Sequence, residues 1–126
     1  MSYATAAAAY KQNAILTASP EKLVVLLYDG AIRHLERSKL LLADQKTQKA
    51  APAGESLGKA MAIVGELRSV LDRSAGGEIA GNLDSLYGFC TDQILAANLE
   101  RRTEPVDHAL RVLRTLKEAW DAIVPH

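Results

Sequence analysis

Few side chains in this sequence offer catalytic or metal-binding chemistry. The candidates are three histidines and one cysteine: His34, His108, His126 and Cys90. A di-iron helical bundle needs Glu-x-x-His pairs that point both ligands inward. The residue three before His34 is Ala31, and the residue three before His108 is Pro105, so neither pair exists. Cys90 has no second cysteine nearby, which leaves it as a small apolar side chain.

Phosphate-binding motifs are also missing. No Walker or dinucleotide-binding glycine pattern occurs, and Gly76-Gly77 joins two expected helices instead of following a strand. We therefore predict no enzyme activity, no cofactor and no metal. One signalling role stays open, a histidine phosphotransfer bundle in which His34 carries the phosphate. The residues after it, Leu35 to Ser38, lack the lysine and glycine that normally follow such a histidine.

Composition predicts one all-helical domain over residues 1–126. A chain of 126 residues is long enough for a single core and too short for two. It carries 21 alanines and 18 leucines, the strongest helix formers, but only one Trp and one Phe. Because aromatic residues favour strands, their scarcity argues against a sheet.

The charge balance argues against two classes of partner. Fifteen basic and fifteen acidic side chains cancel, so the chain lacks the positive field that attracts nucleic acid or anionic lipid. No stretch approaches the roughly 20 apolar residues that cross a bilayer. The first residues lack the basic and then leucine-rich order of a signal peptide. We expect a cytoplasmic protein with no nucleic-acid partner and no membrane insertion.

Start and stop signals divide the chain into four helices after an N-terminal segment. Residues 1–18 are alanine-rich and are expected to form an additional helical or capping segment. Ser19 and Pro20 suit a helix start. Pro52 with Gly54 predicts a loop, and Gly76-Gly77 suits a break between helices. The expected helices span about 19–46, 55–74, 79–101 and 104–123. Short connections between them predict an antiparallel up-and-down four-helix bundle.

The first long helix carries more apolar surface than one core face needs. Its core stripe recurs at helical spacing: Val24, Leu27, Tyr28, Ala31, Leu35, Ser38 and Leu42. In addition, Leu23 to Leu27 is apolar through a whole turn, and Leu40 to Leu42 repeats this feature. The excess must be covered by the N-terminal segment, by a second subunit in a homodimer, or by a client helix laid into a groove. The pattern leaves all three open.

Several strings combine into a more specific signal. They run over most of the chain: Tyr10-x-x-Asn13, Thr17-Ala18-Ser19-Pro20-Glu21-Lys22-Leu23, Leu27-Tyr28-Asp29-Gly30-Ala31-Ile32, Glu66-Leu67, Leu71-Asp72, Gly76-Gly77-Glu78-Ile79-Ala80-x-Asn82-Leu83-x-x-Leu86-Tyr87, Ala97-Asn98 and Trp120. In order and spacing they resemble the FliS family of flagellin-specific secretion chaperones. Chance similarity between two Leu/Ala-rich bundles would not reproduce the polar positions.

The resemblance implies a fold, a client and a mechanism. The family fold is an antiparallel helical bundle with a mobile N-terminal segment. The client is the C-terminal segment of flagellin, which is disordered when free and becomes helical as it wraps the chaperone. Binding in the cytosol blocks premature polymerisation, and the complex is delivered to an export-gate protein of the flagellar type III export apparatus. Other flagellar proteins are further partners that the resemblance suggests.

The resemblance also suggests residues for the client contact. The expected contacts on the first long helix are Leu23, Leu26, Leu27 and Tyr28, with Tyr10 and Ile15 in a removable self-cap. Each of the four helix residues also fits an ordinary place in the core. Two alternative functions stay open beside the chaperone: phosphotransfer through His34, and a purely structural dimerisation domain.

Overall fold

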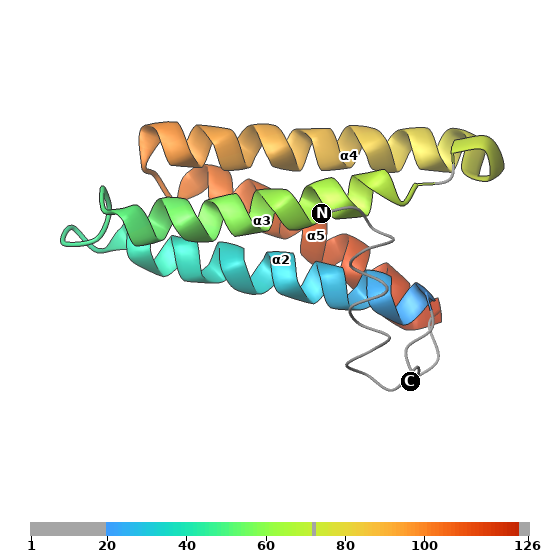
Figure 1. Cartoon of the computed structure of the whole chain (residues 1–126), viewed down its shortest axis with the longest axis horizontal. Helices are drawn as coiled ribbons and strands as arrows, with labels where there is room; N and C mark the ends of the chain where they lie inside the picture. Colours follow the sequence, from blue (N-terminus) through green and yellow to red (C-terminus); the bar gives the residue numbers. More distant parts are fainter. Residues whose placement is uncertain (1–19, 72, 124–126) are drawn as a thin grey trace.

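A computed structural model describes residues 20–71 and 73–123, and these residues form helices joined by short connections (Figure 1). The helices are α2 (Pro20–Ala43), α3 (Ala51–Ser69), α4 (Arg73–Glu100) and α5 (Glu104–Ile123). Consecutive helices run in opposite directions, and the described residues contain no strand. The predicted all-α four-helix bundle is therefore confirmed. The capping segment expected over residues 1–18 lies outside the described residues.

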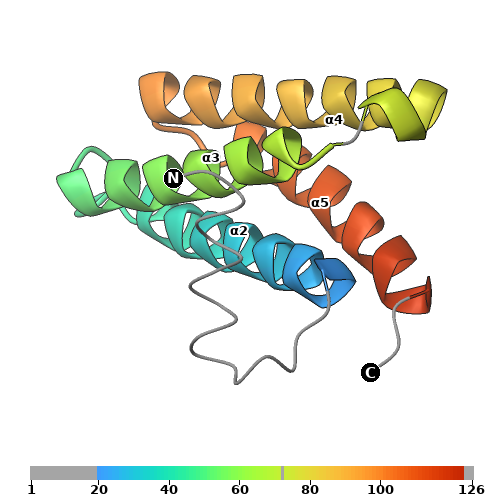
Figure 2. The same ribbon diagram turned by 45° about the vertical axis from the view of Figure 1, so that its right-hand side comes forward.

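The helices form a ring in which each one packs against two others. α2 lies against α3 and α5, and α4 lies against the same two helices. The diagonal pairs, α2 with α4 and α3 with α5, do not approach each other closely through their backbones. Figure 2 shows the ring tight at the end that carries the 44–50 connection and wider at the other end, where α5 turns away from α4. The bundle thus has a tight end and an open end.

The second helix of the bundle begins earlier than the sequence pattern predicts. We expected a start near residue 55, but α3 begins at Ala51 with Pro52 in its first turn. The preceding residue, Ala50, is extended and supplies no side-chain cap. Proline is tolerated here because the first N–H groups of a helix have no partner within it, and its fixed φ already suits a helix. Pro52 therefore starts a helix at a place where it was expected to mark a loop.

The break between α3 and α4 also differs from the prediction. The pair Gly76-Gly77 was expected just past the end of the second helix, but it lies inside α4, which begins at Arg73. The chain turns instead at Val70 and Leu71, whose N–H groups bond to the carbonyls of Glu66 and Arg68. A glycine inside a helix costs about 1 kcal/mol relative to alanine, which weakens the helix without forbidding it. Two glycines at this place therefore do not end α4, which runs through them.

Arg101 holds the tight end of the bundle together. It ends α4 with φ at 54°, a left-handed conformation that is uncommon for a residue other than glycine. Its Nη1 donates to the Ala50 carbonyl at 3.1 Å, and its Nε donates to the Asn98 carbonyl at 3.0 Å. In return, Gln48 Nε2 donates to the Arg101 carbonyl at 2.9 Å. These bonds join the 44–50 connection to the predicted turn between α4 and α5.

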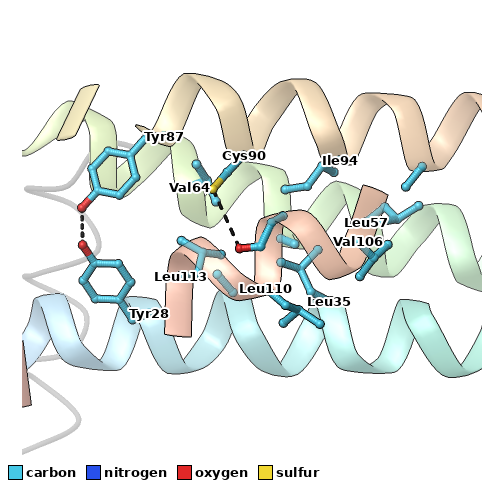
Figure 3. Packing of buried hydrophobic residues seen from close by; sticks show 14 of the residues in the cluster. Tyr28, Leu35, Leu57, Val64, Tyr87, Cys90, Ile94, Val106, Leu110 and Leu113 are labelled. Carbon is cyan, nitrogen blue, oxygen red and sulfur yellow. Dashed lines mark hydrogen bonds between the residues drawn. The ribbon is translucent and has the colours of Figure 1, made fainter. Parts of the chain in front are cut away.

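The core runs along the axis of the ring (Figure 3). All four helices contribute apolar side chains that are almost fully buried, among them Leu35, Leu57, Val64, Ile94, Val106, Leu110 and Leu113. The stripe predicted on the first long helix lies in this core, with Val24 packed at its border. Its one polar member, Ser38, is buried and donates to the Leu35 carbonyl at 2.7 Å. Helical periodicity therefore identified the core face of α2 correctly.

Candidate functional site

Exposed apolar side chains gather on α4. Among the described residues, most large apolar side chains that remain exposed belong to this helix: Ile79, Leu86, Phe89, Leu95 and Leu99. Phe89 is 42% exposed and Leu99 is 82% exposed. Single exposed leucines are normal on soluble proteins, but a group of them on one element marks a surface for another molecule. We call these five residues the α4 apolar surface.

One side of this surface borders α5. Leu86 lies seven residues before Gln93, so both side chains project from the same side of α4. Gln93 Oε1 is 2.8 Å from His108 Nδ1 on α5, which identifies that side as the one facing α5. Farther along α5, Val112, Leu116 and Trp120 are only partly buried against the core. Apolar side chains of both helices therefore line the open end of the bundle where α5 diverges from α4 (Figure 2).

The other side of the surface borders α3. Leu95 and Leu99 are four residues apart and project together from α4. Leu95 follows Asp84 by three helical turns, and Asp84 Oδ1 accepts a bond from Arg68 Nε of α3 at 2.6 Å. The apolar residues thus flank the core stripe of α4 on both sides. An apolar arc of this width exceeds what packing within the bundle requires.

A buried pair of tyrosines connects α2 and α4 near the open end (Figure 3). The hydroxyl groups of Tyr28 and Tyr87 are hydrogen-bonded to each other, and the two ring centroids are 6.3 Å apart. Burial raises the pKa of both hydroxyls. At Tyr28 the bond to Tyr87 and the Trp120 side chain oppose this rise, whereas at Tyr87 the bond to Tyr28 adds to it. A bond donated by Tyr87 to Tyr28 accounts for both directions. The pair ties two helices that do not otherwise approach each other.

Cys90 and the two described histidines lie on three different helices. Cys90 is fully buried in the core with Sγ 3.9 Å from the Ala109 carbonyl, and burial raises the pKa of its thiol to about 12. His34 lies on α2 and His108 on α5, while His126 is outside the described residues. Within residues 20–71 and 73–123, no three His, Cys, Asp or Glu residues are grouped as metal ligands would be.

Comparison with known proteins gives this surface a context. The sequence model of the family described as "Flagellar protein FliS" matches residues 3–126. The chain is 40% identical to the "Flagellar secretion chaperone FliS" of Vibrio cholerae, over 93% of this chain and 87% of that protein. It is 36% identical to the protein of the same name in Salmonella typhimurium, over 90% and 83% of the two chains. This chain belongs to the FliS family. Its family is one of chaperones, which is not a class of enzymes.

The residues that sequence reasoning assigned to the client contact are spread over different environments in this FliS-family bundle. Leu23, Leu27 and Tyr28 are buried in the structure, whereas Leu26 is 37% exposed. The remaining two, Tyr10 and Ile15, lie outside the described residues. Leu26 alone of the described four presents much of its side chain at the surface. The apolar turn from Leu23 to Leu27 is thus largely explained by packing within the bundle.

Sequence reasoning missed the α4 apolar surface. Helical spacing over residues 79–101 predicts Ile79 and Leu86 as core positions and leaves out three residues: Phe89, Leu95 and Leu99. These three lie outside the i, i+3/i+4 pattern of the core, and they are large and apolar. An apolar residue that lies off the core stripe was the available signal.

A nucleophile pattern was also overlooked. Gly54-Glu55-Ser56-Leu57-Gly58 has the Gly-x-Ser-x-Gly spacing of a nucleophile elbow. The elbow requires a sharp turn between a strand and a helix, but this string lies within α3. Ser56 is buried, and its Oγ accepts a bond from Arg37 Nε at 3.2 Å. The serine therefore has a cation as its partner in place of a general base.

None of the helices in the part of the chain that the structure describes has the length and apolar character needed to cross a membrane.

Proposed function

We propose that this FliS-family chain is a flagellin-specific chaperone of the flagellar type III export system. In the cytosol it binds the C-terminal region of flagellin, prevents premature polymerisation and delivers flagellin to an export-gate protein. The observation that carries this proposal is the family match over residues 3–126, with relatives named flagellar secretion chaperones. It favours chaperone function over phosphotransfer through His34.

The α4 apolar surface supports the proposal physically. A client segment that folds on binding can cover a broad apolar surface as an amphipathic helix, anchored by residues at i, i+3/i+4 and i+7. The exposed residues along α4 and the partly buried edge of α5 offer such a surface. Because ordering the client costs free energy, the complex can form tightly enough to block polymerisation and still be released at export.

The client contacts expected from the sequence remain part of the proposal. Leu26 reaches a client directly from the surface of α2, and Tyr10 and Ile15 belong to the proposed self-cap. The three buried residues, Leu23, Leu27 and Tyr28, reach a client only if the open end widens further. The mobile cap over residues 1–18 is likewise part of this proposal.

Calorimetric titration with a flagellin C-terminal segment tests the function. We expect a defined one-to-one complex, a negative heat-capacity change from apolar burial, and a gain of helical circular dichroism on mixing. A flat titration together with unchanged circular dichroism would exclude flagellin as the client. Adding an acid-denatured globular protein of similar size controls for unspecific apolar binding.

A matched pair of variants tests where the client binds. Phe89→Glu places a charge in the α4 apolar surface and should weaken client binding at least about tenfold. Leu40→Glu makes the same kind of change on α2, where the side chain is 75% exposed, and should leave client affinity unchanged. If both variants lost the same client affinity, or only Leu40→Glu lost affinity, the client would not bind on α4. Sedimentation of the free protein then distinguishes a homodimer on the same surface, because Phe89→Glu would dissociate it.

A further inference from the structure

Basic side chains gather on the face where α2 meets α3. Arg33, His34 and Arg37 lie within slightly more than one turn of α2, and Lys59 lies on α3. Arg37 Nε donates to Ser56 Oγ of α3 at 3.2 Å, which places its guanidinium at the junction of the two helices. We call these four residues the α2/α3 basic surface.

No carboxylate among the described residues forms an ion pair with the three permanent cations of this surface. In the described part of the chain, several other cations have ionic partners; for example, Lys39 Nζ is 2.7 Å from Asp107 Oδ1, and Arg68 pairs with Asp84. Arg33, Arg37 and Lys59 have no such partner within 4 Å among the described residues. The nearest acids along α2 point elsewhere: Glu36 pairs with Arg114, and Asp29 lies 3.4 Å from Lys117. A chain with no net charge therefore keeps a local excess of positive charge here.

The imidazole of His34 reports the same excess. Partial burial lowers the pKa of His34, and the positive charges of Lys59, Arg33 and Arg37 lower it further. The charged groups that act on it all carry the same sign, and they come from both helices that meet at this face. The four side chains therefore form one electrostatic surface.

Apolar side chains stand at both ends of the basic surface. Leu26, Arg33, Arg37 and Leu40 are spaced so that they project from one side of α2. Leu26 is 37% exposed and Leu40 is 75% exposed. The distance between them along the helix is about 21 Å, or roughly four turns. The exposed face of α2 is thus apolar at each end and cationic in the middle.

The basic surface lies on the opposite side of the bundle from the apolar edge shared by α4 and α5. In the ring of helices, the α2–α3 pair and the α4–α5 pair form opposite sides, because α2 and α4 are diagonal, as are α3 and α5. Figure 1 shows α2 and α4 at opposite edges of the molecule. A molecule bound to the α4/α5 edge would leave the α2/α3 face accessible.

We propose that the α2/α3 basic surface docks an amphipathic helix of a partner protein, acidic in its middle turns and apolar at both ends. Each exposed ion pair is worth little alone, but several complementary charges steer association and fix the register. The apolar ends favour a helical protein partner over a nucleic acid, because a phosphate backbone has no apolar side chains to pack against Leu26 and Leu40. This docking uses a different surface from the α4 apolar surface, and it shares only Leu26 with the client contacts expected from the sequence.

A designed peptide tests the docking surface. The probe is a fluorescent helical peptide about four turns long, with leucine near each end and glutamates between them on the same face. We expect it to bind the full chain, more weakly as ionic strength rises. Arg33→Glu with Lys59→Glu should reduce its affinity at least about tenfold, because both side chains are exposed and the change reverses the local charge. The matched control is Arg111→Glu with Lys46→Glu, two exposed cations outside the surface, which should bind normally.

Several results would overturn the proposal. The acidic peptide could fail to bind at low salt, or a peptide with lysines in place of the glutamates could bind equally well. The test and control variants could lose the same affinity, or a short DNA duplex could bind more tightly than the peptide. Amide chemical shifts of the unmodified protein supply a readout that needs no variant. Peptide-induced changes should centre on α2 and α3, and changes confined to α4 and α5 would equally reject the assignment.

Discussion

The hydrogen bond between Tyr28 and Tyr87 offers a quantitative test of how the open end is held. Both hydroxyls are buried, so a partner removed from one leaves the other without a bond and without water. Leaving a buried hydroxyl unsatisfied costs about 1–3 kcal/mol, whereas removing both partners together is close to neutral. We therefore expect Tyr28→Phe and Tyr87→Phe each to destabilise the protein by about 1–3 kcal/mol. The double variant should lose much less than the sum.

The two single variants should also differ from each other. Tyr28 also has the Trp120 side chain as a neighbour, which lowers the pKa of its hydroxyl. Tyr28→Phe breaks both interactions and strands the Tyr87 hydroxyl, so it should be the more costly change. Tyr87→Phe leaves Tyr28 with Trp120 as a remaining neighbour. The ordering follows from the number of partners lost.

Urea unfolding of the four proteins measures the coupling. Fluorescence and circular dichroism transitions give the free energy of unfolding for the natural chain, both single variants and the double variant. The interaction energy from this cycle should be at least about 1 kcal/mol in favour of the pair. Strict additivity of the two single losses would refute the claim that the hydroxyls depend on each other. Single variants as stable as the natural chain would refute the claim that the bond is buried and needed.

Three further predictions concern the tight end, the basic surface and the core. Arg101→Ala removes the guanidinium bonds and keeps a side chain at a left-handed backbone position, so it should lower the free energy of unfolding by about 1–2 kcal/mol. Arg101→Gly should cost less, because glycine adopts this backbone conformation without strain; urea unfolding compares the two variants. The pKa of His34 is lowered in the folded protein, so as pH falls below 6.5 the unfolded chain binds a proton at this histidine before the folded protein does, and the free energy of unfolding should decrease. Unfolding midpoints measured across pH should show a smaller decrease in His34→Gln. Cys90 should resist thiol reagents at pH 8 until the protein unfolds, because the thiol is buried and its pKa is raised to about 12; rapid labelling under native conditions would contradict this.

Local sequence signals determined the class of fold and the core face of α2. An alanine- and leucine-rich composition with helical periodicity leaves few alternatives to a bundle, and the predicted stripe from Val24 to Leu42 packs in or beside the core. The family was also readable from the chain itself, because polar positions at fixed spacing are improbable by chance. These predictions rest on hydrophobic periodicity and residue spacing, which depend only on residues close together along one helix.

Helix ends were predicted less well because they depend on more than local residue preference. Pro52 was expected in a loop but lies in the first turn of α3, and Gly76-Gly77 was expected past a helix end but lies inside α4. Proline suits the first turn of a helix as well as a loop, and a glycine inside a helix costs only about 1 kcal/mol, so neither residue type defines a helix end by itself.

Only the tertiary structure decided which apolar residues stay exposed and where charge collects. Burial depends on which helices lie beside a face, so the apolar turn from Leu23 to Leu27 became mainly core while Phe89 and Leu99 remained outside. In the same way, Lys59 joins Arg33 and Arg37 only because α3 packs against α2. The sequence alone determined a helical FliS-family chaperone. Its surfaces for binding depend on contacts between distant segments, which no local pattern encodes.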